Sequence, residues 1–169
     1  NPLTAEAYDT SAKVNPPLRS SHDLEALICG LKDGTIDFIA TDHAPHSTAE
    51  KHCTFEEAAC GISVLETALG SLMSLVRNGA ITLPLMIEKL SSAPANFLGL
   101  DSGTLRVGAP ADVTVFDPDV EWVVNASNFI SKGKNTPLAG SSLKGKSVLV
   151  LVDGEVRYRA GIGPDGDNT

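Results

Sequence analysis

Apolar residues at helical spacing dominate the first hundred residues of the chain. They recur every three or four positions in four stretches, each of which predicts a helix that buries one face. A shorter apolar run, 36–40, lies between a glycine and a proline turn and predicts a buried strand. The predicted helices are 21–31, capped by Ser21, then 55–76, interrupted near Gly61, then 82–90 and 92–98.

Beyond residue 100 the pattern changes to short β-like runs separated by turns. These runs are 112–116, 121–124, 147–152 and 156–158. Between the last two, Asp153-Gly154 is a typical two-residue hairpin turn. The pattern therefore predicts an α/β chain, with helices and at least one strand in residues 1–100 and a β-rich unit in residues 101–169.

The composition narrows the class of function. The chain has 169 residues, is 42% hydrophobic and carries a net charge of −8, without the clustered Lys and Arg that nucleic acids require. No apolar run reaches the roughly 18 residues of a membrane-spanning helix. Three cysteines with no CxxC pair favour free thiols in a reducing compartment such as the cytoplasm. The first residue is not methionine, and we expect the chain to be part of a longer protein.

The best candidate for chemistry is Asp42, at the end of the predicted strand. Folds with buried parallel strands collect their catalytic groups at strand ends, and a carboxylate there can bind a metal or accept a proton. His43 and His46 follow, on either side of Ala44-Pro45. Spacing alone leaves two interpretations open, a hydrogen-bonded turn or part of a metal site. The four histidines form no HxH or HExxH pair, so the chain alone does not complete a tetrahedral zinc site.

Two motifs resemble those of dihydroorotases, which are cyclic amidohydrolases of the amidohydrolase superfamily. Residues 42–46 read DHAPH, and residues 15–19 read NPPLR. Residues 55–62 resemble the segment that follows in that family, and 93–117 resemble the superfamily's return from the barrel to its β-rich domain. Dihydropyrimidinases and allantoinases are near relatives, but Asn15 before Pro16 and the full DHAPH favour dihydroorotase.

The resemblance implies a fold and an activity. The fold is the C-terminal part of a TIM-like (β/α)8 barrel in residues 1–100, followed by a small β-rich segment of a composite β-sandwich in residues 101–169. The activity is the reversible, zinc-dependent cyclisation of N-carbamoyl-L-aspartate to dihydroorotate in de novo pyrimidine biosynthesis, with two Zn²⁺ ions in the complete enzyme. The chain would carry only part of that active site, and we expect it to be inactive alone.

The resemblance also assigns roles to five residues. Asp42 is implied as zinc ligand and general base, and Asn15 and His46 as substrate-binding residues. Cys60 and Gly61 match a pair that contacts substrate, where Phe-Gly is usual; the cysteine is a departure that does no harm if the contact is made by the backbone. His43 is expected to be structural.

Two other functions stay open from the sequence. One is a dihydropyrimidinase- or allantoinase-like cyclic amidohydrolase. The other is a catalytically inactive, dihydroorotase-like scaffold for aspartate transcarbamoylase. Besides the small-molecule substrate, the implied partners are therefore a second copy of the chain in a homodimer, or aspartate transcarbamoylase.

Overall fold

The computed structural model describes residues 8–161, which fall into two compact units. Unit 1 comprises Asn1–Ala26, Ala40–Ala68 and Trp122–Leu143. Unit 2 comprises Leu27–Ile39, Leu69–Glu121 and Lys144–Thr169. The chain passes between them several times, so each unit is assembled from segments far apart in the sequence.

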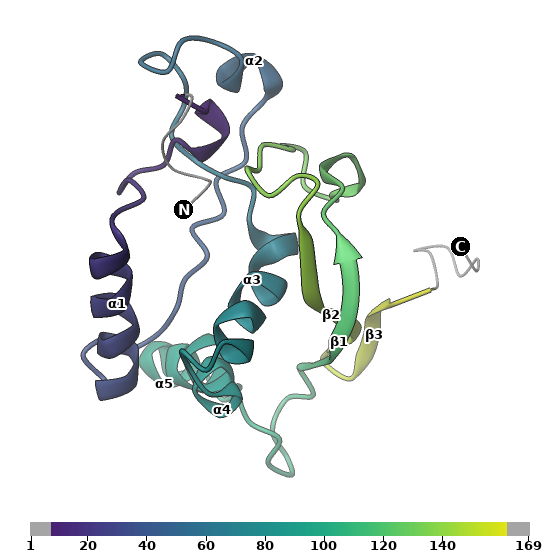
Figure 1. Ribbon diagram of the computed structural model, residues 1–169. Helices are drawn as coiled ribbons and strands as arrows, with labels where there is room; N and C mark the ends of the chain where they lie inside the picture. Colours follow the sequence, from purple (N-terminus) through teal and green to yellow (C-terminus); the bar gives the residue numbers. More distant parts are fainter. Residues whose placement is uncertain (1–7, 162–169) are drawn as a thin grey trace. The chain divides into compact units, whose positions relative to one another are not determined.

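The first predicted helix is confirmed as α1, Ser21–Asp33 (Figure 1). Its cap is Ser20 rather than Ser21. The Ser20 hydroxyl accepts from the backbone N–H of Asp23 at 3.3 Å, and the Asp23 carboxylate accepts from the Ser20 N–H at 3.0 Å. These two bonds satisfy donors that the start of a helix leaves unpaired.

The predicted strand 36–40 is wrong for this structure, because these residues pair with no strand ladder. Their contacts are instead to a helical turn: the Ile39 N–H donates to the Lys89 carbonyl at 2.9 Å, and the Lys89 ammonium donates to the Ile36 carbonyl at 2.8 Å. A strand exists only with a neighbour that accepts its hydrogen bonds. Among the described residues, the nearby parallel pairing is a single bridge between His43 and Ile62.

The predicted helix 55–76 is only partly confirmed. Helix α3 covers Leu65–Arg77, whereas residues 55–64 form turns and the bridge to His43. Gly61 has a φ of +151°, a conformation that glycine adopts readily and that a helix does not contain. A short helix that the pattern did not predict, α2 (Thr48–Lys51), precedes this stretch.

The two later helices are confirmed as α4 (Leu83–Ile87) and α5 (Ala93–Leu98), joined by a π-helical turn, η2 (Glu88–Ser92). The Thr82 hydroxyl caps α4, and Gly99 ends α5 with a left-handed φ of 67°. The core of unit 2 is centred on Met73, Ile81 and Met86, each 3% exposed or less. The apolar faces of α3 and α4 thus supply most of this core.

The β-rich part is a three-stranded sheet, whose strands are labelled in Figure 1, and hydrogen bonds give them the order β1-β2-β3. Two predicted runs merge into one strand, β1 (Val113–Val123), and the last two become β2 (Ser142–Val152) and β3 (Glu155–Arg159). Strands β2 and β3 are antiparallel, and the turn between them is the predicted Asp153-Gly154, with φ of 52° and 77°.

Two short 3-10 turns, η1 (Thr10–Ala12) and η3 (Ala126–Asn128), complete the described elements. No helix within residues 8–161 is long and apolar enough to span a membrane.

Met86 tests the core of unit 2. Replacing it with alanine should lower the free energy of unfolding by about 2–5 kcal/mol, because its side chain is 1% exposed and its removal would leave a cavity. Leu105→Ala is the matched control: its side chain is 83% exposed, and the change should stay within about 0.5 kcal/mol. Urea unfolding of the three proteins measures both values, and equal losses would contradict this assignment of the core.

Candidate functional site

The loop that follows Asp42 is attached to the start of α3 by His43. The Nδ1 atom of His43 accepts hydrogen bonds from the backbone N–H groups of Val64 and Leu65, at 3.0 and 3.2 Å. Because Nδ1 accepts, the proton of the neutral ring is on Nε2, which lies 3.3 Å from the Ser131 hydroxyl. His43 therefore caps a helix, in agreement with the structural role expected for it.

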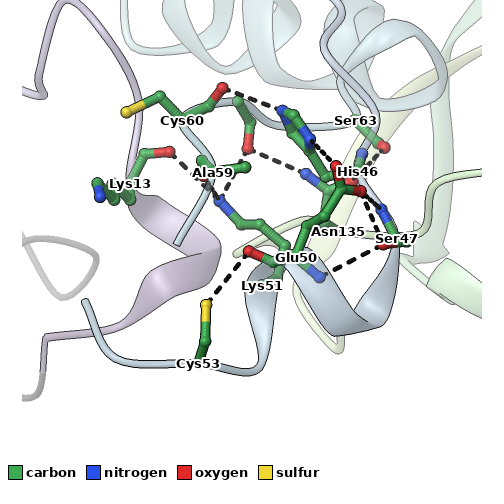
Figure 2. Close-up of polar contacts among 11 residues, drawn as sticks. Lys13, His46, Ser47, Glu50, Lys51, Cys53, Ala59, Cys60, Ser63 and Asn135 are labelled. Atoms are coloured by element: carbon green, nitrogen blue, oxygen red, sulfur yellow. Dashed lines mark hydrogen bonds and ion pairs between the residues drawn. The ribbon is translucent and has the colours of Figure 1, made fainter. Parts of the chain in front are cut away.

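His46 is held at both its backbone and its ring. Its backbone N–H donates to Asn135 Oδ1 at 2.7 Å. Its Nε2 lies 3.1 Å from the Cys60 carbonyl oxygen, which can only accept, so Nε2 carries a proton (Figure 2). Its Nδ1 faces Glu50 Oε1 at 3.7 Å. The imidazole is thus fixed between Cys60 and Glu50.

The residues after His46 form a capping box at the start of α2. The Ser47 hydroxyl accepts from the Glu50 N–H, and the Glu50 carboxylate accepts from the Ser47 N–H at 2.8 Å. Hydrogen bonds from Ser47, together with the nearby His46 ring, lower the pKa of Glu50. Glu50 is therefore a carboxylate at neutral pH, placed beside the His46 ring.

Gly61 lies in contact with the loop that carries His46. A Cβ atom at Gly61 would lie 2.7 Å from the Ala44 Cβ and 2.9 Å from His46 Nε2, closer than carbon atoms approach in proteins. Its N–H donates to the Lys13 carbonyl at 3.0 Å. Its carbonyl oxygen accepts from Lys51 at 3.1 Å and from Asn135 Nδ2 at 2.9 Å. Both backbone polar groups of Gly61 are thus bonded within the protein.

Lys51 is a buried cation, only 3% exposed. Its ammonium group donates to the carbonyl oxygens of Ala59, Gly61 and Lys13, at 2.8, 3.1 and 3.4 Å (Figure 2). Burial lowers the pKa of Lys51, because desolvation disfavours the charged form. The ammonium thus ties the end of α2 to the segment that contains Cys60 and Gly61.

A third segment reaches the site from residues 133–135. The Ser63 hydroxyl lies 2.7 Å from the Gly133 carbonyl and 3.0 Å from Asn135 Oδ1, and the Ser63 N–H donates to the Asn135 carbonyl at 2.8 Å. Gly133 packs so tightly that a Cβ there would lie 2.7 Å from the His46 nitrogen. Loop 43–46 is therefore enclosed by segments 60–64 and 133–135.

The structure brings together three of the five predicted site residues, namely His46, Cys60 and Gly61. Asn15 and Asp42 are exposed, and their neighbours Lys13 and His43 make the contacts that tie their segments to this cluster. Asp42 has a φ of +47°, a left-handed conformation that aspartate tolerates better than most residues and that occurs often at functional sites.

The residues of this cluster do not by themselves fit a zinc ion. Within residues 8–161, no group of three or more His, Cys, Asp or Glu side chains is placed to hold a metal. The rings of His43 and His46 are both engaged in hydrogen bonds to protein atoms. Asp42 is an exposed carboxylate of a type that binds zinc, so it can supply one ligand at most.

Sequence reasoning overlooked Glu50, Lys51, Ser63, Gly133 and Asn135. A usable signal existed for Glu50, because Ser47-Thr48-Ala49-Glu50 has the S-x-x-E spacing of a capping box. For Asn135 there was none, since its partners His46 and Gly61 are 89 and 74 positions away in the sequence.

The sequence matches the amidohydrolase family over residues 7–157. The chain belongs to the amidohydrolase family. Within it, the chain is homologous to dihydroorotases, which confirms the resemblance carried by its two motifs. It is 51% identical to the dihydroorotase of Syntrophus aciditrophicus (strain SB) over 160 residues, and 52% identical to that of Geobacter sp. (strain M21) over 162 residues.

These alignments cover 93% and 94% of this amidohydrolase chain but 38% of each relative, so the chain spans just over a third of their length. Among solved structures, the L-hydantoinase (dihydropyrimidinase) from Arthrobacter aurescens superimposes with a TM-score of 0.83 at 32% identity. That match covers 90% of this chain and 35% of the hydantoinase. The mixed α/β fold of the chain is therefore that of part of an amidohydrolase.

The tight packing around Gly61 predicts a large effect of Gly61→Ala. The added methyl group would meet Ala44 and His46, so we expect a loss of about 1–3 kcal/mol in the free energy of unfolding beyond the cost of the backbone conformation. Gly140→Ala gives the cost of a left-handed backbone without any packing conflict, because Gly140 has a φ of +79° with nothing within 4 Å of the added carbon. Since the φ of +151° at Gly61 is less favourable still for alanine, this cost is a lower limit for the backbone cost at Gly61. Equal losses in the two variants, measured by urea unfolding, would rule out the packing.

Lys51→Met should destabilise the chain by about 1–3 kcal/mol, because buried carbonyl groups lose their donor.

The difference in stability between the unsubstituted chain and Lys51→Met should also depend on pH. The pKa of Lys51 is lowered in the folded chain from its ordinary value of 10.5, so between the two values the unfolded chain binds more protons. The stability of the unsubstituted chain relative to Lys51→Met should therefore rise as the pH increases towards 10.5. Urea unfolding at several pH values tests this, and parallel pH profiles would refute it.

Proposed function

We propose that this chain forms part of a dihydroorotase and supplies one side of its active site. The supporting observation is the identity of about 50% to dihydroorotases along more than nine-tenths of the chain. The reaction is the reversible cyclisation of N-carbamoyl-L-aspartate to dihydroorotate in pyrimidine biosynthesis. In the direction of hydrolysis, water attacks the ring amide carbonyl and the bond to the ring nitrogen breaks.

In this proposal Asp42 is the general base. It accepts a proton from the attacking water and returns it to the departing nitrogen, a role suited to an exposed carboxylate at a fixed backbone position. Its location supports the role, because the next residue, His43, anchors the loop to the start of α3.

Substrate binding is assigned to Asn15, His46, Cys60 and Gly61. The Asn15 amide can donate to and accept from an amide ring. His46 offers its Nε2–H, which here donates to the Cys60 carbonyl. In the proposal a substrate carboxylate replaces this carbonyl as the acceptor. Because Gly61 lacks a side chain, the Cys60-Gly61 backbone and His46 can lie close together.

Zinc is part of the proposal, with Asp42 as one ligand; within residues 8–161 no group of three or more His, Cys, Asp or Glu side chains completes the site. A zinc ion held in part by Asp42 would polarise the amide carbonyl and lower the pKa of the attacking water. We further propose that residues 1–100 belong to the C-terminal part of a (β/α)8 barrel and residues 101–169 to a β-rich domain. The proposed assembly is a homodimer or a complex with aspartate transcarbamoylase. Its proposed location is the cytoplasm.

A second candidate is a hydantoinase-like activity on cyclic amides without a carboxylate. The superposition on the Arthrobacter aurescens L-hydantoinase, with a TM-score of 0.83, favours it. The lower sequence identity, 32% against 51–52% for the dihydroorotases, places it second.

Hybrid enzymes test the proposal. In one hybrid this chain replaces the matching 162 residues of the Geobacter sp. (strain M21) dihydroorotase, and in a second it replaces the matching part of the Arthrobacter hydantoinase. We expect the first hybrid to cyclise carbamoyl aspartate and the second to be inactive on hydantoins. In the first, Asp42→Asn should lower kcat by about 10²-fold or more, because the base is lost, and should lower the zinc content.

Asp37→Asn is the matched control, since Asp37 is an exposed carboxylate five positions earlier. It should leave both kcat and zinc content unchanged. A first hybrid that unfolds as cooperatively as the parent enzyme but turns over no carbamoyl aspartate would contradict the proposal, as would an active second hybrid with an inactive first.

A further inference from the structure

The side-chain amide of Asn135 contacts two residues of the proposed substrate site at once. Its oxygen accepts from the His46 backbone N–H at 2.7 Å, and its nitrogen donates to the Gly61 carbonyl at 2.9 Å (Figure 2). Because an N–H can only donate and a carbonyl can only accept, these partners leave a single orientation for the amide. Reversing the amide would lose both bonds, and it would place an N–H group against the His46 N–H and an oxygen against the Gly61 carbonyl oxygen.

The segment that carries Asn135 has little freedom to move. A Cβ at Gly133 would lie 2.5 Å from the Pro45 Cβ and 2.7 Å from the His46 nitrogen, so the two backbones touch. The Ser63 N–H holds the Asn135 carbonyl at 2.8 Å, and the Ser63 hydroxyl lies close to both Gly133 and Asn135. Ser63 itself is buried, at 1% exposed. The amide is therefore presented from a fixed backbone.

The contacts continue from Asn135 to the His46 ring. The His46 backbone is bonded to Asn135, while its Nε2 is bonded to the carbonyl of Cys60. Gly61, the residue after Cys60, is bonded to the same asparagine. One side chain thus holds the backbone of His46 and the backbone of Gly61, next to Cys60, on the two sides of the hydrogen bond between His46 and Cys60. Substrate-binding side chains must be held within about 0.5 Å of their productive position, and supporting hydrogen bonds of this kind hold them there.

We infer that Asn135 is the positioning residue that holds the His46 backbone, and with it the base of the imidazole side chain, at the proposed substrate site. This rests on the proposed function, in which His46 binds the carboxylate-bearing substrate. Asn135 takes no part in the chemistry itself. Its loss should weaken substrate binding and leave the chemical step largely intact.

The test uses the hybrid with the Geobacter dihydroorotase, carrying Asn135→Ala. We expect KM for dihydroorotate to rise roughly tenfold while kcat changes by less than about threefold, the pattern of lost binding. Hydrogen exchange measured by mass spectrometry should become faster in the peptide that contains the His46 amide, because that N–H loses its acceptor. Should Asn135→Ala fail to fold, Asn135→Asp keeps the volume but sets an oxygen against the Gly61 carbonyl, with the same expected rise in KM.

Asn125→Ala is the matched control. Asn125 lies in the same unit and also makes side-chain hydrogen bonds, to Ser127 at 3.1 and 2.6 Å, and both of these bonds lie within its own turn. It should change neither KM nor exchange at His46.

Three results would overturn the inference. These are unchanged exchange at His46 in Asn135→Ala, an equal rise in KM in Asn125→Ala, and a fall in kcat as large as the rise in KM together with faster exchange throughout the protein. An inactive unsubstituted hybrid would instead contradict the proposed function. The exchange at His46 would then still decide whether Asn135 holds the loop.

Discussion

Gly61 has no side chain, and three segments of unit 1 approach one another at this residue for that reason. The loop 43–46 packs against it at distances that no Cβ would allow. Lys51 and Asn135 donate to its carbonyl oxygen from different parts of the sequence. A side chain here would push the loop away from Gly61 and so strain the Asn135 amide, which bonds to both the His46 N–H and the Gly61 carbonyl. The polar network therefore depends on this steric constraint.

Hydrogen bonds, more than ion pairs, set the geometry of this network. The contact between His46 Nδ1 and Glu50 Oε1 spans 3.7 Å beside a carboxylate that is 55% exposed, and even with the ring protonated such a pair contributes about 0–1 kcal/mol. The bonds that Lys51 and Asn135 donate to Gly61 are buried and partly buried, and leaving a buried carbonyl without its donor costs about 1–3 kcal/mol. Burying the charge of Lys51 costs stability, because its partners are neutral backbone carbonyl groups. The three hydrogen bonds to these carbonyls offset part of that cost.

Local signals in the sequence were enough for the elements that depend on local interactions. The helix from Ser21, the helix from Leu83 and the Asp153-Gly154 turn are set by capping residues, apolar spacing and left-handed turn residues, and all three are found. The run 36–40 failed because a strand is defined by its neighbours. The candidate site divides in the same way. The motifs singled out His46 and Gly61, which the structure places side by side, whereas Asn135 reaches both through contacts that no local pattern encodes.

The state of His46 bears on the choice between the two candidate substrates. Its Nε2–H now donates to a neutral carbonyl, that of Cys60. Dihydroorotate carries a carboxylate, and a charged acceptor binds such a donor roughly twice as strongly as a neutral one. A hydantoin or dihydropyrimidine ring offers only neutral carbonyls. A hydrogen bond from His46 to such a ring would be no stronger than its present bond to the Cys60 carbonyl. If His46 binds substrate as proposed, its replaceable neutral partner therefore suits the carboxylate-bearing ring, in line with the higher identity to dihydroorotases.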